Sequence, residues 1–186
     1  RRSLNLEKAL SRLDYSMGGV NYTRQIFASA PDQVIVIRMT ADRPGMLSLQ
    51  AEFSCQLRSE VSTEENRILL EGIAPSQVDP SYVDSANPVI YEEAPEKKGM
   101  RFCAVLEAVA EGGTIERCCD KLKIENADSV TLFLAARTSF NGPFQQPFLA
   151  GKPYKEPCFE ELLAARRKGY DKLFERHLED YQQGLS

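Results

Sequence analysis

Few residues in this chain have the types and spacing that chemistry at an active site requires. The sequence holds 27 aspartate and glutamate residues but one histidine, His177. General acid–base catalysis needs two carboxyl groups with separated pKa values in one cleft, whereas most carboxylates here fall at polar positions of predicted strands or on the outside of a predicted helix. A histidine-based triad would depend on His177, unless a partner chain supplied another histidine. We interpret His177 as a packed residue that hydrogen-bonds to a neighbour, and we predict no catalytic residue in this chain.

The cysteines and glycines do not form a metal, redox or phosphate motif. Gly18-Gly19 and Gly112-Gly113 stand between predicted strands rather than before a helix, so neither is a phosphate loop. We therefore expect no metal and no cofactor. Free and mostly buried thiols are favoured over a disulfide framework, which favours an intracellular location but leaves export open. Neither zinc-site nor C-x-x-C spacing occurs among the five cysteines, Cys55, Cys103, Cys118, Cys119 and Cys158.

Charge and hydropathy exclude two classes of partner. The formal net charge is -4 and the isoelectric point is about 5.2, so we expect no nucleic acid as partner. The nearest approach to a basic cluster is 166–168, Arg-Arg-Lys, which we interpret as the solvated face of a helix. No apolar run approaches the roughly 20 residues of a membrane-spanning helix, so we expect no membrane partner.

The first 140 residues have the pattern of antiparallel strands. Apolar and polar residues alternate from Leu47 to Leu57, with Cys55 on the apolar face, which predicts one strand that is buried on one side. The nearly continuous apolar run 34–37 predicts a strand that is covered on both faces. Residues 74–99 read as a long surface excursion. The predicted strands are 13–17, 20–28, 33–41, 47–57, 68–73, 102–110, 114–119, 121–125 and 129–136, and this number of short strands predicts a mostly β fold, an antiparallel sandwich.

The pattern changes after the last predicted strand. Residues 141–158 are rich in proline and read as a linker. Residues 159–186 carry apolar side chains at spacings of three and four, which predicts an amphipathic helix. Its apolar stripe requires a partner, either the sandwich or a part of the protein outside this chain.

One polar segment is a candidate binding loop. Residues 137–141 follow a predicted buried strand, at a position where the loops of sandwich domains often carry binding groups. An ordinary strand exit is the alternative interpretation. From this segment we select Thr138, Ser139, Phe140 and Asn141 as candidate substrate-binding residues.

Several motifs occur in the order of a known family. Residues 15–35 read YSMGGVNYTRQIFASAPDQVI, residues 41–45 read ADRPG, and residues 177–182 read HLEDYQ. These segments resemble the N-terminal domain and connector helices of glycoside hydrolase family 95, in which glutamate is commoner at the position of Gln25. The resemblance spans nearly the whole chain, and the longest segment is its specific part.

The resemblance implies a function for a longer protein. Members of that family are inverting exo-hydrolases that release terminal α-L-fucose from glycans, and some relatives prefer L-galactose. Their N-terminal region is an antiparallel super-sandwich that helices connect to an (α/α)₆ barrel, and the catalytic glutamate and asparagine lie in that barrel. By this resemblance we expect 1–140 to be the sandwich, with its N-terminal part missing, 141–158 the linker and 159–186 the connector helix. The expected partners are the rest of the same polypeptide and, through it, a glycan.

An independent carbohydrate-binding or protein-interaction module is the alternative. Such a module would expose aromatic rings that stack on sugars, and five aromatic residues lie in predicted loops: Tyr82, Tyr91, Phe144, Phe148 and Tyr154. An apolar connector helix has no purpose in a free-standing module, however. We therefore favour a scaffold for a catalytic domain that this chain lacks, with residues 138–141 near the sugar site.

Overall fold

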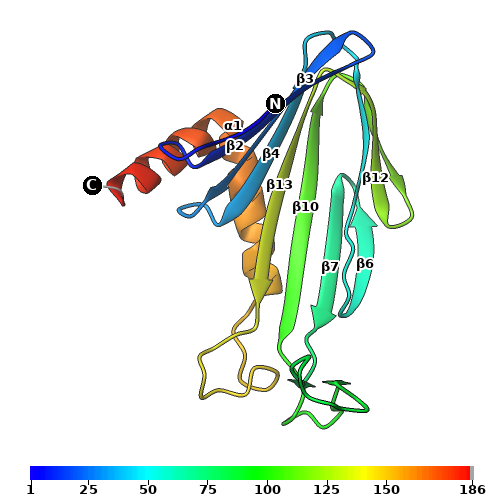
Figure 1. Ribbon diagram of the computed structural model, residues 1–186, viewed down its shortest axis with the longest axis vertical. Coiled ribbons are helices and arrows are strands. Elements are labelled where there is room, and N and C mark those ends of the chain that lie inside the picture. The colour runs from blue at the N-terminus through cyan, green and yellow to red at the C-terminus, as the bar shows by residue number, and fades with distance from the viewer. Residues whose placement is uncertain (185–186) are drawn as a thin grey trace.

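The computed structural model describes residues 1–184, which form thirteen strands and one long helix (Figure 1). The strands are antiparallel, so the prediction of a mostly β, sandwich-like fold with a C-terminal helix is confirmed. The elements are β1 (Arg2–Asn5), β2 (Leu10–Met17), β3 (Val20–Ser29), β4 (Val34–Ala41), β5 (Leu47–Glu52), β6 (Arg58–Glu64), β7 (Arg67–Ile73), β8 (Gln77–Val78), β9 (Val89–Ile90), β10 (Arg101–Glu111), β11 (Thr114–Cys118), β12 (Lys121–Ala127), β13 (Ser129–Thr138) and α1 (Lys155–Gln183).

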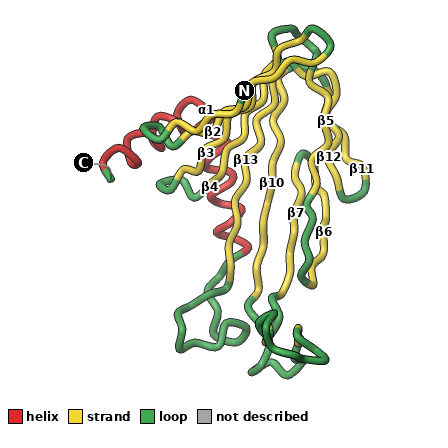
Figure 2. Tube along the Cα trace, in the orientation of Figure 1, coloured by secondary structure: helices red, strands yellow, loops and turns green. Residues whose placement is uncertain are grey.

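Eight strands form one large sheet in the order β1-β2-β3-β4-β13-β10-β7-β6. Strands β10 and β13 are neighbours in the interior of this sheet, paired from Phe102↔Thr138 to Glu111↔Ser129. A second sheet has the order β11-β12-β5 and lies beside the upper part of the large one (Figure 2). The short pair β8 and β9 lies within the long excursion that precedes β10.

The large sheet has a core on each of its faces because apolar residues alternate along its central strands. Val105 of β10 and Phe133 of β13 face α1, whose Leu162 and Leu173 are buried against them. Leu106 of β10 faces the smaller sheet and belongs to the core between the two sheets. The helix therefore packs its apolar stripe on the sandwich, which was one of the two partners that we considered for it.

One predicted strand is wrong. We expected a single strand from Leu47 to Leu57, but β5 ends at Glu52 and the chain then crosses to the large sheet as β6. The apolar alternation continues through this crossover, so the pattern does not reveal where the pairing partner changes. Cys55 accordingly lies outside a strand and is only partly buried.

The helix begins at Lys155, ahead of the expected start at residue 159, and the expected last residues 185–186 lie outside the described part of the chain. Pro157 falls in the first turn, where a missing N–H costs no helical hydrogen bond. Gly169 interrupts the helix with φ 74° and ψ 173°, a conformation that is essentially confined to glycine. This kink lets both halves of α1 follow the sheet.

The cluster 166–168 is not simply a solvated face, which corrects our interpretation. Arg166 forms an ion pair with Glu107 at 3.1 Å, and Lys168 forms one with Asp32 at 2.9 Å. Both carboxylates are buried beneath α1. A buried charge is tolerated when it is paired, so these cations face the sheet because it holds their counter-ions.

His177 is a packed residue, as predicted. It is buried, its ring stacks on Phe27 with the centroids 5.0 Å apart, and its Nε2 donates a hydrogen bond to the Lys8 carbonyl at 2.9 Å. Its contacts tie the second half of α1 to the sheet and to the turn between β1 and β2.

Candidate functional site

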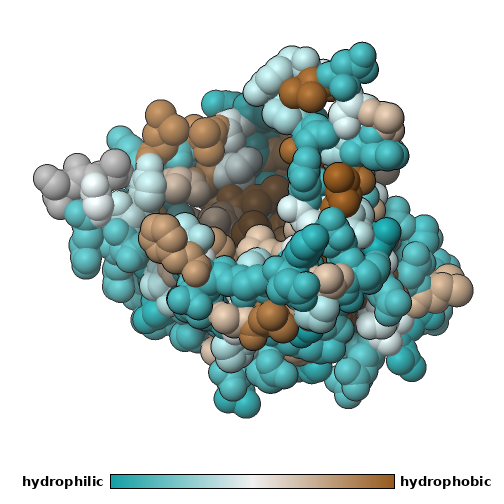
Figure 3. Space-filling model, turned by 90° about the horizontal axis from the view of Figure 1, so that it is seen from below, coloured by the Kyte–Doolittle hydropathy of each residue, from teal (hydrophilic) through white to brown (hydrophobic). Residues whose placement is uncertain are grey.

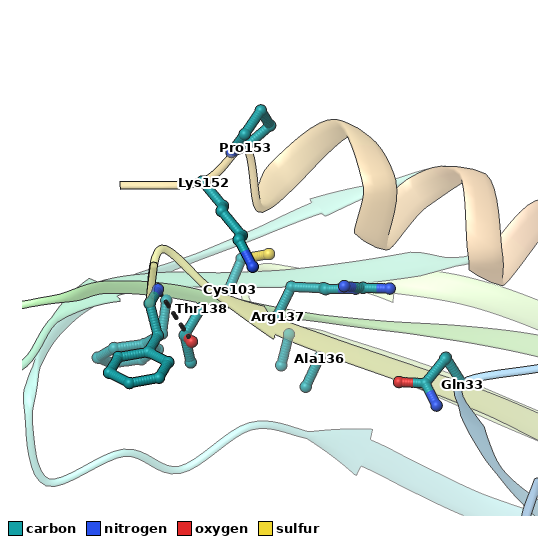
Figure 4. A pocket seen from close by; sticks show the side chains of 10 residues that line it. Gln33, Cys103, Ala136, Arg137, Thr138, Lys152 and Pro153 are labelled. Atoms are coloured by element: carbon teal, nitrogen blue, oxygen red, sulfur yellow. Dashed lines mark hydrogen bonds between the residues drawn. The ribbon is translucent and has the colours of Figure 1, made fainter. Parts of the chain in front are cut away.

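The candidate site lies where strand β13 extends beyond the end of its neighbour β4. The pairing of β13 with β4 stops at Leu134↔Ile35, whereas β13 continues to Thr138. Residues 135–138 of β13 therefore have no partner in β4. The segment before α1 lies above the end of β13 (Figure 4), and a pocket of about 460 Å³ lies between this segment and strands β10 and β13. Its lining residues are Gln33, Phe102, Cys103, Ala104, Ala136, Arg137, Thr138, Phe140, Lys152 and Pro153.

Two of the four predicted substrate-binding residues line this pocket. Thr138 is exposed, and its Oγ1 accepts a hydrogen bond from the Phe140 N–H at 3.4 Å (Figure 4). The Phe140 side chain is 54% exposed. These two side chains are therefore available to a ligand.

The other two predicted residues do not line the pocket and instead hold the loop in place. Ser139 is buried, and its Oγ accepts a hydrogen bond from the Arg101 N–H at 3.0 Å and donates one to the Pro147 carbonyl at 2.8 Å. The Asn141 side-chain amide donates to the Ala150 carbonyl at 2.9 Å. Ser139 and Asn141 thus fix the conformation that presents Thr138 and Phe140.

Three polar residues outside the four selected ones complete the pocket, and of these only Arg137 belonged to the candidate segment 137–141. Gln33 comes from the turn between β3 and β4 and Lys152 from the segment before α1, while Arg137 precedes the predicted residues on β13. Gln33 has φ 55°, which is uncommon for a residue other than glycine. No periodic pattern reveals this backbone conformation. The pairing of β4 with β13 brings Gln33 near Thr138, and the Lys152 N–H donates a hydrogen bond to the Ser139 carbonyl at 3.1 Å, which holds Lys152 there.

The charges of the pocket favour binding rather than catalysis. Arg137 donates hydrogen bonds from Nε and Nη2 to the two carboxylate oxygens of Glu161 in α1, and this pairing raises the pKa of Arg137 above its ordinary value. Lys152 supplies a second cation. No aspartate, glutamate or histidine is among the lining residues within the described part of the chain. The pocket therefore offers hydrogen-bond donors and an aromatic ring, which suit a hydroxyl-rich ligand, but it lacks an acid–base pair.

The thiols beside the pocket are not activated nucleophiles. Cys103 and Cys158 are both buried, between β10 and α1. The hydrogen bond with Cys103 and then burial raise the pKa of Cys158 well above its ordinary value. The hydrogen bond with Cys158 lowers the pKa of Cys103 despite its burial. Because a nucleophilic cysteine requires partial exposure as well as a lowered pKa, and both thiols are fully buried, this pair is part of the core. All five cysteines are free thiols.

The loop aromatic residues do not form one stacking platform. Tyr82 is 87% and Phe144 is 95% exposed. Tyr91 is covered by the Arg58 guanidinium at 4.1 Å from its ring centroid, and Phe148 by that of Arg101 at 4.0 Å. Cations thus occupy two of the ring faces that a sugar would need.

Residues 1–184 contain neither a cluster of metal-ligating side chains nor a membrane-spanning helix. No group of three or more His, Cys, Asp and Glu side chains is placed to hold a metal ion there. No helix in the same range is both long enough and apolar enough to span a membrane.

Comparison with known families decides the kind of domain. Residues 1–143 match the family described as glycosyl hydrolase family 65, N-terminal domain. The chain belongs to this family. The match covers the whole β-sheet region and ends just after the candidate loop, so the expectation of an N-terminal sandwich domain of a glycoside hydrolase is confirmed.

Relatives of this glycosyl hydrolase family 65 N-terminal domain are much longer than the chain. The chain is 35% identical over 189 residues to α-L-fucosidase 2 of Arabidopsis thaliana. This alignment covers 98% of the chain and 22% of the fucosidase. A solved structure described as a kojibiose phosphorylase from the human microbiome superposes with a TM-score of 0.55 and 10% identity over 97% of this chain and 24% of the other. At that identity the second likeness shows the fold alone. The chain thus spans about a quarter of the length of these two proteins.

Proposed function

We propose that this domain is part of an inverting exo-glycosidase of family 95 that releases terminal α-L-fucose, or L-galactose, from glycans. The observation that carries the proposal is the 35% identity to an α-L-fucosidase over nearly the whole chain. The family-specific run at residues 15–35 supports it. The catalytic groups belong to a part of the polypeptide outside this chain, because the pocket described above has no acid–base pair.

In this proposal the domain acts as a scaffold. The sandwich buttresses the catalytic barrel, and α1 connects the two. The pocket at the end of β13 supports a second, smaller role, since Thr138 and Phe140 face outward on a loop that Ser139 fixes. We place this loop near the sugar site of the complete enzyme.

Hydrolysis of a chromogenic α-L-fucoside tests the assignment. We expect this chain to show no turnover above the enzyme-free background, and a polypeptide extended through the barrel to be active. The reason is that a glycosidase needs two carboxyl groups placed across the scissile bond, and the described pocket supplies none. Turnover by the short chain would contradict the scaffold role, and an inactive but folded long protein would contradict the fucosidase assignment.

Phe140→Ala in the longer protein tests the loop. We expect KM for the fucoside to rise several-fold with kcat little changed, because the ring contributes binding without touching the reacting atoms. Phe144→Ala is the matched control, since Phe144 lies in the same loop region but does not line the pocket. Equal KM values for the two variants and the unmodified protein would mean that the loop does not contact the sugar.

An independent carbohydrate-binding module is the second candidate. The exposed rings of Tyr82 and Phe144 favour it, because aromatic faces stack on sugars. The burial of the apolar stripe of α1 against the sheet also weakens the objection that an apolar connector helix has no purpose in a free-standing module. Binding of fucosylated glycans to this chain alone, measured by calorimetry, would favour the module over the scaffold.

A further inference from the structure

The smaller sheet covers only part of the large sheet's inner face. Along β13 the residues on this face become steadily more exposed: Val130 and Leu132 are buried, Leu134 is half-buried and Ala136 is exposed. All four side chains are apolar. The sequence therefore continues to supply core residues beyond the point where the cover ends.

The neighbouring strand β4 repeats this gradient. Met39 is buried beneath the smaller sheet, Ile37 is half-buried and Ile35 is 39% exposed. Viewed from below, the molecule is hollowed, and apolar side chains gather inside the hollow (Figure 3). We call this uncovered area the open floor; it consists of Ala28, Ile35, Leu134 and Ala136.

A free strand edge borders the open floor. Strand β5 is the last strand of the smaller sheet and pairs with β12 on one side. Its residues 49–52 line a cleft of about 320 Å³ together with Ile37 and Leu132 of the large sheet. An edge strand presents unpaired N–H and C=O groups at alternate residues, so β5 can accept another strand over the floor.

An unpaired donor lies in the same cleft. Arg24 of β3 lines it, and the buried Nε of Arg24 has no hydrogen-bond partner among the described residues. A buried donor without an acceptor is costly. A backbone carbonyl or carboxylate of an added strand would supply the missing acceptor.

We infer that an extended strand of the same polypeptide, from outside residues 1–186, pairs with the free edge of β5 and covers the open floor. This rests on the proposed function only in taking the chain as one part of a longer glycoside hydrolase. Because packed sheets lie about 10 Å apart, the space beside β5 holds a single layer of strands rather than a folded partner. The added strand continues the existing interface between the sheets, with alternate apolar residues facing Ile35 and Leu134.

Hydrogen exchange in the longer protein tests the inference without altering a residue. We expect all backbone amides of 48–52 to be protected, because β12 bonds one set and the added strand bonds the other. Rapid exchange at alternate amides would overturn the inference. Protection that is lost on dilution would also overturn it, because a second copy would then be the occupant.

Two matched substitutions provide a second test in the longer protein. Ile35→Asp is expected to lower the thermal midpoint by several degrees, whereas Leu57→Asp should leave it unchanged, although both side chains are 39% exposed in this chain. Equal shifts for the two variants would overturn the inference. Neither readout uses fucoside hydrolysis, so an active enzyme with an unprotected β5 would refute the added strand alone, and an inactive enzyme with a protected β5 would refute the fucosidase assignment alone.

Discussion

Replacing Phe27 with alanine is expected to lower the free energy of unfolding by about 3–5 kcal/mol, the usual cost of deleting a buried aromatic ring. Phe27 is buried on β3 where the second half of α1 crosses the sheet. Its ring centroid lies 5.5 Å from that of Tyr170, 5.3 Å from that of Phe174 and 5.0 Å from that of His177. Its removal would leave these three helix residues around a cavity. Urea denaturation followed by circular dichroism measures the change.

Tyr82→Ala is the control for this prediction. Tyr82 is 87% exposed, so its truncation should change stability by no more than about 0.5 kcal/mol. If Phe27→Ala costs no more than the control, the second half of α1 is not anchored by this ring, and the packing described for the helix would have to be revised.

The double substitution Lys168→Ala and Arg176→Ala is expected to lower the free energy of unfolding by about 3–5 kcal/mol at neutral pH, because it leaves the buried carboxylate of Asp32 without its two cations. Lys168 Nζ lies 2.9 Å and Arg176 Nε 3.1 Å from Asp32 Oδ1. Ser29 Oγ donates a further hydrogen bond to the carboxylate at 2.8 Å, and this bond would remain in the variant. Both cations are partly exposed, so their removal does not itself open a cavity.

The pH dependence of stability distinguishes this effect from a packing defect. Burial raises the pKa of Asp32, but the hydrogen bonds from Lys168, Ser29 and Arg176 together outweigh burial and lower it. The folded-state pKa is thus below the unfolded value of about 3.9. The resulting stability is present above pH 4 and is lost as the pH falls through the folded-state pKa.

In the double variant burial dominates, so the pKa of Asp32 should rise above its unfolded value. Protonation then relieves the penalty, and the stability difference between the two proteins should shrink between pH 7 and pH 3.5. Lys172→Ala is the control, since Lys172 pairs with Glu175 on the exposed face of the same helix, where such pairs contribute about 0–1 kcal/mol. A difference that is equal at both pH values would contradict the electrostatic explanation.

Local residue patterns predicted most of the strands and the helix. Short apolar runs bounded by turn residues placed β3, β4, β10 and β13 close to their observed bounds, because a strand in a layered fold must bury at least one face. The same reasoning assigned His177 to the core. The long motif at residues 15–35 indicated the kind of domain before any contact was known. Each of these inferences depends on neighbours in the sequence, which the sequence itself displays.

Contacts between distant segments decided the rest. The alternation from Leu47 to Leu57 hid a change of sheet, because a period of two is the same whichever strand is the partner. Asp32 and Lys168 are far apart in the chain, so their ion pair depends on where the kinked helix crosses the sheet. The pocket beside Thr138 likewise exists because β4 stops before β13 does. Thus the residue pattern determined the elements and the domain family, whereas strand order, helix docking and unequal strand ends determined the charge pairs, the pocket and the open floor.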